Sequence, residues 1–322
     1  MTGTGREHGV GEPSLEAAKG SPLMRHGILA ICALLALVGC GSDEATPSVP
    51  TSAQTSTEPL RDASGNLIEG LFEVGGGRSL YLKCEGTGSP TVVYLHGGGG
   101  VSSNAGQIPG LLNEDYRFCV YDRANVGRSD PAEGPFSASD AVADLHALLA
   151  AADLPAPYVL LGASFGGVVA FTYAGTYPDD VAGVVLLDPD VPGARVWEQE
   201  FVPEELRPPE DSWKADPEQM DINETLSVLD AAAGNVPPVP AILFALEDND
   251  FPPEFSEGAN EALRQLQEEA VGYFDPGEVR IVDSPHYMEP VIPEEIAAAV
   301  REVIGATAAT GVAAPSRAST ST

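Results

Sequence analysis

Short apolar runs alternate with segments of helical periodicity through most of this chain. The runs are rich in β-branched and aromatic residues and are bounded by glycine, proline or polar residues, which is typical of strands. They are SLYLKC (79–84), PTVVYL (90–95), YRFCVYD (116–122), PYVLLG (157–162), VAGVVLLD (181–188), AILFAL (241–246) and GEVRIVD (277–283). Most are apolar without alternation, so we predict a mainly parallel sheet with helices on both faces, an α/β fold.

Helical patterns lie between these runs. In residues 137–154 the apolar positions fall on one face, and Ser137 with Asp140 forms the pattern of a capping box. A last helix is predicted to begin at Pro293, followed by two glutamates in its first turn, and to end at Gly305. Two further helical patterns cover residues 165–178 and 254–270.

Regularity is lost between residues 191 and 238. This stretch contains Trp197, Trp213, several prolines and many acids, and its helical periodicity is weak. Because the strand pattern resumes directly after it, we interpret residues 191–238 as a short cap inserted after the sixth strand and not as a second domain.

The N-terminal part resembles a bacterial lipoprotein signal. MRHGILAICALLALVGCGSDE has a basic start, a short apolar core and small residues before Cys40, which would be lipidated; an ordinary secretory signal is the alternative. Translation would start at Met1 or Met24. We expect the protein to be exported and anchored by lipid to the outer face of the cytoplasmic membrane, or secreted.

These patterns divide the chain into four parts. Residues 1–39 are expected to be an N-terminal extension and signal, and residues 40–61 a disordered tether rich in Ser, Thr and Pro. The folded domain is predicted over residues 62–305, with a disordered tail over 306–322. About 245 residues suit one large α/β domain.

Charge excludes some partners. The 322 residues include 48 acids and 16 bases, for a net charge of −32. Such a field repels nucleic acid and anionic membrane surfaces, so membrane contact is expected only through the lipid anchor. Cys84 and Cys119 are the cysteines left after the signal, and in an oxidising compartment they form either a disulfide or two buried thiols.

Ser164 is the candidate nucleophile, in GASFGG between a predicted strand and a predicted helix. Gly162 and Gly166 are expected there because side chains at these positions would collide with the neighbouring strand and helix. The turn would hold the serine in a strained backbone conformation and direct the amide of Phe165 toward a developing oxyanion.

A nucleophilic serine needs a base, and His286 is the candidate because it follows the last strand at the carboxyl end of the sheet. His146 has the pattern of a solvated helix position, and His96 is expected to shape the loop that it opens. The histidines lie at positions 8, 26, 96, 146 and 286, and the first two precede the expected cleavage site.

The order of HGGGG (96–100), YDRANVGRSD (121–130), GASFGG (162–167) and SPHYMEP (284–290) resembles the α/β-hydrolase fold superfamily, above all its serine esterases and peptidase-like hydrolases. The likeness covers nearly all of residues 66–305. It implies a Ser–acid–His triad and an oxyanion hole from the amides of Gly98 and Phe165. It would also place the strands of Cys84 and Cys119 side by side, which favours the disulfide.

The acid of the triad is where the pattern departs from the superfamily. Its members usually carry an aspartate a few residues after the strand read here as AILFAL, often following a glycine that EDND lacks. Asp248 has the best spacing, Asp250 is the alternative, and Glu247 competes. A less common geometry would use Asp188 or Asp190.

The resulting expectation is a serine hydrolase that cleaves an ester or amide of a small substrate through an acyl-enzyme. No cofactor and no metal are expected. Two alternatives stay open: an aminopeptidase similar to proline iminopeptidases, with Glu204 or Glu205 binding the substrate ammonium, and a non-catalytic ligand-binding lipoprotein. The sequence does not indicate an oligomeric state.

Overall fold

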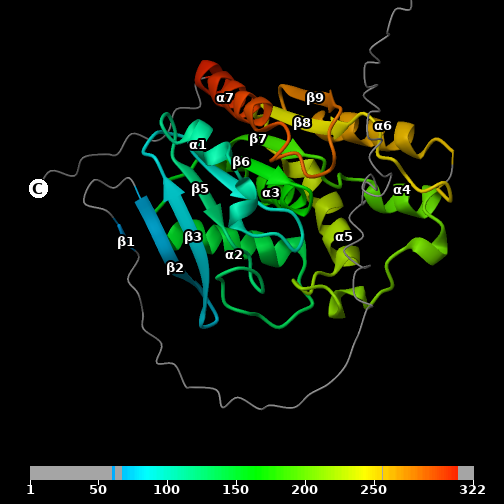
Figure 1. Ribbon diagram of the computed structural model, residues 1–322, viewed down its shortest axis with the longest axis horizontal. Helices are drawn as coiled ribbons and strands as arrows, with labels where there is room; N and C mark the ends of the chain where they lie inside the picture. Colours follow the sequence, from blue (N-terminus) through cyan, green and yellow to red (C-terminus); the bar gives the residue numbers. More distant parts are fainter. Residues whose placement is uncertain (1–59, 62–66, 256, 311–322) are drawn as a thin grey trace, which may run out of the picture.

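A twisted sheet forms the centre of the protein in the computed structural model, which describes residues 60–61, 67–255 and 257–310 (Figure 1). The strand order in this part of the chain is β1-β2-β3-β5-β4-β6-β7-β8-β9. The strands are β1 (Leu60–Arg61), β2 (Leu67–Gly75), β3 (Arg78–Glu85), β4 (Thr91–Leu95), β5 (Phe118–Tyr121), β6 (Tyr158–Ala163), β7 (Val181–Leu187), β8 (Ala241–Leu246) and β9 (Gly277–Val282).

The six neighbouring strands β5, β4, β6, β7, β8 and β9 are parallel to one another, and β1, β2 and β3 add an antiparallel edge. This confirms the prediction of a mainly parallel sheet. Cys84 on β3 lies opposite Cys119 on β5 in the ladder, and the two form a disulfide. The predicted pairing of these cysteines is therefore confirmed.

Helices cover both faces of the sheet, as predicted (Figure 1). In β4, Val93 and Leu95 face the core under α2 and α3, whereas Val92 and Tyr94 face the core under α1 and α7. A strand that is apolar at every position is thus buried on both sides. The helices are α1 (Ile108–Leu112), α2 (Ala138–Ala151), α3 (Phe165–Thr176), α4 (Ala194–Phe201), α5 (Ile222–Ala232), α6 (Ala259–Val271) and α7 (Pro293–Thr310).

The helix ends match the sequence in one case and differ in another. Ser137 caps α2, and Asp140 accepts a hydrogen bond of 2.8 Å from the Ser137 amide, which confirms the capping box. The last helix begins at Pro293 as predicted but continues past Gly305 to Thr310. The residues after Gly305 include three alanines, which favour continued helix over a glycine stop.

The domain boundaries shift outward at both ends. Residues 60 and 61 were expected to belong to the tether, but they pair with β2 as β1, and residues 306–310 belong to α7 and not to a tail. The expected extension and signal over residues 1–39 and the lipidated Cys40 lie outside the described residues, so they stay predictions. No helix of the described part is long and apolar enough to cross a bilayer.

The cap predicted over residues 191–238 contains α4 and α5. Trp197 of α4 is buried against Phe255 and Leu263, which follow β8 in the chain, so the cap packs on residues 251–255 and on α6. Helix α5 packs on α2 and α3. The sequence did not separate α5 from the irregular part of the cap because its apolar face is short and is interrupted by polar residues.

Candidate active site

Ser164 stands at a sharp turn between β6 and α3. Its backbone has φ 50° and ψ −123°, a conformation that non-glycine residues rarely adopt. A Cβ on Gly162 would lie 2.5 Å from the Gly166 carbonyl oxygen, and a Cβ on Gly166 would lie 2.0 Å from the Leu95 carbonyl oxygen. The two glycines are required by close backbone approach, as the sequence indicated.

His286 is hydrogen-bonded to Asp188 at the carboxyl edge of the sheet. Its Nδ1 lies 2.8 Å from Asp188 Oδ2, and both side chains are largely buried. Asp188 follows β7, the strand next to β6, and the Ser164 amide donates to the Leu187 carbonyl at 2.8 Å. Adjacent strand ends therefore bring the serine and the histidine-bound aspartate to the same place.

The acid preferred from the sequence, Asp248, does not contact His286. Its Oδ1 accepts hydrogen bonds from the Asp250 amide and from Asn260 Nδ2, both at 3.0 Å, and its side chain is exposed. Asp250, the alternative, and Glu247 are exposed as well. The acid is corrected to Asp188, which the sequence named only as the less common geometry. The loop after β8 is bonded to α6 and is thereby held away from the histidine.

Two opposing effects act on His286. Burial lowers its pKa, and the hydrogen bond and charge of Asp188 raise it, with smaller contributions from Asp190 and Glu289; the net result is a pKa above the usual value. The bond to Asp188 also fixes the tautomer, since a neutral imidazole that donates from Nδ1 presents Nε2 as the acceptor. That is the form a general base needs.

His96 shapes the glycine-rich loop after β4, as expected. Its Nε2 accepts from the Arg123 amide at 3.3 Å, and its Nδ1 donates to the Gly97 carbonyl at 2.8 Å. Burial, followed by the nearby charge of Arg123, holds the pKa of His96 well below its ordinary value, so the ring is neutral. A Cβ on Gly97 would lie 3.5 Å from the Ser164 Cβ, which places the loop beside the nucleophile.

The two amides expected to form an oxyanion hole belong to the first residue of α3 and to the glycine-rich loop after β4. Phe165 is the first residue of α3, where amides have no partner within the helix. In the described part of the chain the Gly98 amide donates to no other group, whereas the Gly99 amide donates to Glu218 at 2.6 Å. No pattern in the sequence indicates a role for Glu218, because it lies in the irregular part of the cap.

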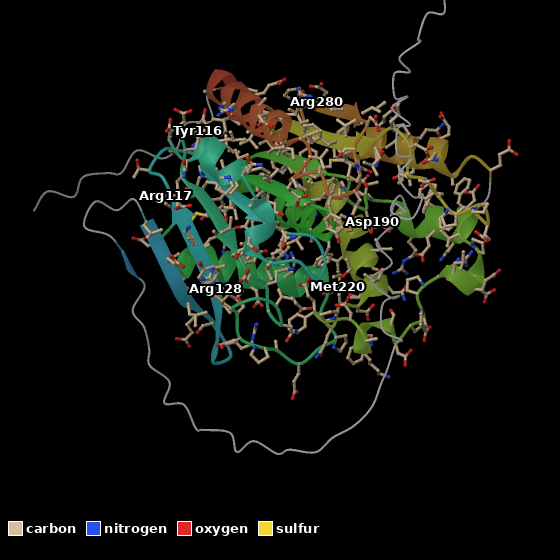
Figure 2. All side chains as sticks on the ribbon, viewed as in Figure 1. Tyr116, Arg117, Arg128, Asp190, Met220 and Arg280 are labelled. Atoms are coloured by element: carbon tan, nitrogen blue, oxygen red, sulfur yellow. A yellow bond between two sulfur atoms is a disulfide. The ribbon has the colours of Figure 1, made fainter. Side chains whose placement is uncertain are left out.

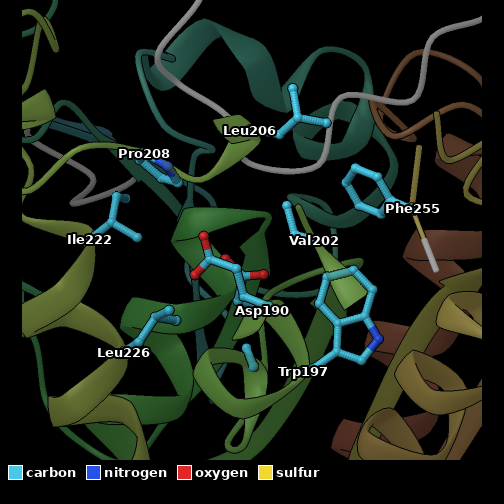
Figure 3. A pocket seen from close by; sticks show the side chains of 10 residues that line it. Asp190, Trp197, Val202, Leu206, Pro208, Ile222, Leu226 and Phe255 are labelled. Carbon is cyan, nitrogen blue, oxygen red and sulfur yellow. The ribbon is translucent and has the colours of Figure 1, made fainter. Parts of the chain in front are cut away.

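An open pocket lies under the cap beside Asp190, and the space in it measures about 480 Å³ when the part open to solvent is included. Asp190, two residues after Asp188, lies where the strands end and the cap begins (Figure 2). Figure 3 shows its carboxylate among apolar side chains. The pocket is lined by Asp190, Ala194, Trp197, Glu198, Val202, Leu206, Pro208, Ile222, Leu226 and Phe255.

Two carboxylates, those of Asp190 and Glu198, border this pocket. They differ from Glu204 and Glu205, the cap residues that were expected to bind a substrate ammonium. Burial and the neighbouring Asp188 raise the pKa of Asp190 to about 6, and burial raises the pKa of Glu198. Glu204 and Glu205 are exposed and are not among the residues that line the pocket. Among the described residues no group of three or more His, Cys, Asp or Glu side chains is arranged to hold a metal ion.

Comparison with known proteins agrees with this geometry. A family model described as the alpha/beta hydrolase fold matches residues 90–216. Uncharacterized protein YqjL of Bacillus subtilis (strain 168) is 30% identical over 122 residues, which cover 38% of this chain and 47% of that protein. Lipase 3 of Moraxella sp. (strain TA144) is 28% identical over 167 residues, 52% of each chain. The chain spans about half the length of these curated relatives.

Solved structures share the fold at low identity. A putative lipase from Acinetobacter baumannii AYE superposes with a TM-score of 0.54 at 15% identity, covering 76% of this chain and 93% of that one. A variant of the Vigna radiata epoxide hydrolase gives a TM-score of 0.56 at 14% identity, covering 74% and 98%. The chain thus has the α/β-hydrolase fold, and its relatives by sequence include lipases.

Proposed function

We propose that this protein is a serine hydrolase that cleaves a carboxylic ester of a small substrate through an acyl-enzyme. The observation that carries the proposal is the bond between His286 and Asp188 at the end of the strand next to the one that presents Ser164. A strained serine, an oriented imidazole and a buried carboxylate are the groups that nucleophilic acyl transfer requires.

In this mechanism His286 removes the proton from Ser164 Oγ as the oxygen attacks the substrate carbonyl carbon. The amides of Gly98 and Phe165 stabilise the oxyanion of the tetrahedral intermediate. The intermediate expels the alcohol, which takes the proton from His286, and leaves the acyl group on Ser164. Water activated by His286 then releases the acid, and Asp188 stabilises the imidazolium in both steps.

The pocket beside Asp190 supports a substrate with an apolar part. Most of its lining is apolar, with Trp197 and Phe255 as aromatic walls (Figure 3), and Asp190 lies two residues after Asp188 in the chain. Apolar pockets with few polar groups bind by surface burial and use the polar groups to orient the ligand.

The experiment compares wild type with Ser164→Ala on a chain-length panel of p-nitrophenyl esters. We expect the alanine variant to lose turnover by at least about a thousandfold, with an unchanged circular dichroism spectrum, because the nucleophile is absent. A fluorophosphonate probe should label wild type at Ser164 only. Equal turnover in both proteins would refute the ester hydrolase, and a wild type inert to the probe and to every ester would favour a non-catalytic ligand-binding protein.

One observation favours an aminopeptidase as the second candidate. The carboxylates of Asp190 and Glu198 border an otherwise apolar pocket, and a substrate ammonium would compensate their charge. Proline arylamides compared with the acyl esters separate the two functions. A preference for the arylamide that is lost in Asp190→Asn would support the aminopeptidase.

A further inference from the structure

One buried guanidinium contacts both segments that would supply oxyanion donors. Arg123, which follows β5, donates from Nη1 to the His96 carbonyl at 2.6 Å and from Nη2 to the Gly97 carbonyl at 2.8 Å. Its Cζ lies 4.8 Å from the centre of the Phe165 ring. The carbonyls just before Gly98 are therefore held by Arg123, while the amide of Gly98 is left free.

The charge of Arg123 is neutralised by a residue of the cap. Glu218 Oε2 accepts from Arg123 Nε at 2.7 Å, and Oε1 accepts from Nη2 at 2.8 Å. The same Oε1 accepts from the Gly99 amide at 2.6 Å. Both side chains of the ion pair are only 5% exposed. Glu218 thus fixes the C-terminal side of the loop as Arg123 fixes its N-terminal side.

A tight turn of the cap delivers Glu218 to this position. Asp216 Oδ1 accepts from the Glu218 amide at 2.8 Å and from the Met220 amide at 3.3 Å, and Gln219 has a positive φ of 56°. The turn is held to the body of the protein by two backbone bonds: the Phe136 amide donates to the Gln219 carbonyl at 2.8 Å, and the Asp221 amide donates to the Phe136 carbonyl at 2.6 Å. The cap is therefore attached to the sheet next to the catalytic loop and not only through its apolar contacts.

A buried ion pair is a weak source of stability, because removing two charges from water offsets most of their attraction. Here the ion pair contributes by fixing the conformation of the loop over residues 96–99. Three side-chain hydrogen bonds from two other chain segments converge on a glycine-rich loop that has few side chains of its own to fix it.

We propose that Arg123 and Glu218 are a positioning pair that holds residues 96–99 so that the Gly98 amide stays free beside Ser164, and that seating the cap through Glu218 completes the oxyanion hole. The proposal rests on the serine hydrolase function. It implies that the ester is turned over only when the 216–220 turn is in place.

The test compares Glu218→Gln with Asp144→Asn. The control makes the same neutralising change in a second bidentate pair, since Asp144 accepts from Arg78 at 2.7 and 2.9 Å, and this pair lies on α2 and β3 away from the loop. Glu218→Gln should lower kcat about 10- to 100-fold with KM within about twofold, because the oxyanion forms only in the transition state. Its Ki for a trifluoromethyl ketone should rise by the same factor. Asp144→Asn should leave all three constants within about twofold.

Arg123→Lys provides a second variant, since it keeps the positive charge but cannot bond both carbonyls and the carboxylate. Amide hydrogen exchange adds a readout that is independent of turnover: exchange in residues 97–101 should accelerate at least about tenfold in both loop variants and not in Asp144→Asn. If wild type hydrolyses no ester while exchange is faster in the two loop variants, the proposed function is refuted and the positioning pair stands. If wild type is active but the loop variants show unchanged exchange, or Glu218→Gln shows unchanged kcat and Ki, the positioning pair is overturned.

Discussion

At the scale of single residues, the site depends on side chains held in unusual backbone conformations. Ser164 has φ 50° and Asp188 has φ 44°, and both directly follow buried strands. Such conformations cost about 1–3 kcal/mol each and persist only where the surrounding structure enforces them. Two of the six non-glycine residues with a positive φ in the described part of the chain are thus the proposed nucleophile and the proposed acid.

Asp188→Asn tests the acid. The amide cannot stabilise the imidazolium and favours the wrong tautomer, so kcat should fall by up to about 10⁴-fold. Because Asp188 raises the pKa of His286 and the base must be neutral, kcat/KM of wild type should fall with decreasing pH through a pKa above about 6.5. In the variant this acid limb should move to lower pH.

The matched control is Asp248→Asn, which changes an exposed aspartate in the loop after β8. Its kcat and its acid limb should equal those of wild type. A loss of activity in Asp248→Asn with normal activity in Asp188→Asn would restore the acid preferred from the sequence and contradict the hydrogen bond seen to His286.

At the scale of elements, β6 and α3 approach each other closely enough to exclude side chains at the turn. A Cβ on Gly166 would overlap the carbonyl oxygens of Leu95 and His96, at 2.0 and 2.6 Å, and backbone cannot move aside as a flexible side chain can. The pattern G-x-S-x-G is therefore a packing requirement between two neighbouring strands and a helix.

Gly166→Ala should lower the free energy of unfolding by about 1–3 kcal/mol or more and should displace Ser164, so ester turnover should fall as well. Urea unfolding and kcat measure the two effects. Gly305→Ala is the control: no atom lies within 4 Å of its added Cβ, and alanine in the interior of α7 should raise stability by about 0.5–1 kcal/mol. Similar stability changes in both variants would contradict the close approach.

At the scale of the whole molecule, the disulfide joins the antiparallel edge of the sheet to its parallel part. Cys84 and Cys119 are 35 residues apart and almost fully buried, on paired strands β3 and β5. A crosslink that closes a loop of this length lowers the entropy of the unfolded chain and is expected to contribute about 3–4 kcal/mol.

The double variant Cys84→Ala/Cys119→Ala should therefore unfold at a clearly lower temperature than the oxidised wild type. Wild type refolded in dithiothreitol should approach the melting temperature of the variant, and the variant itself should not respond to the reductant. Differential scanning calorimetry measures both. Equal melting temperatures in all four samples would show that the bond does not form or does not stabilise the fold.

The sequence by itself determined those features that depend on local patterns. Unalternated apolar runs specify strands buried on both faces, and a serine between glycines at a strand–helix junction specifies the sharp turn at Ser164. The position of His286 after the last strand was likewise readable, because the carboxyl ends of parallel strands share one edge.

Which acid contacts His286, and which residues hold the loop over residues 96–99, depends on contacts between distant segments. Several aspartates follow strands in this acidic chain, and only strand order shows that Asp188 is next to Ser164 while Asp248 belongs to the loop against α6. Glu218 and Arg123 are hydrogen-bonded although they are 95 positions apart in the sequence, and Glu218 belongs to a part of the cap whose apolar positions follow no clear period. Contacts between segments this distant depend on packing that no local pattern encodes.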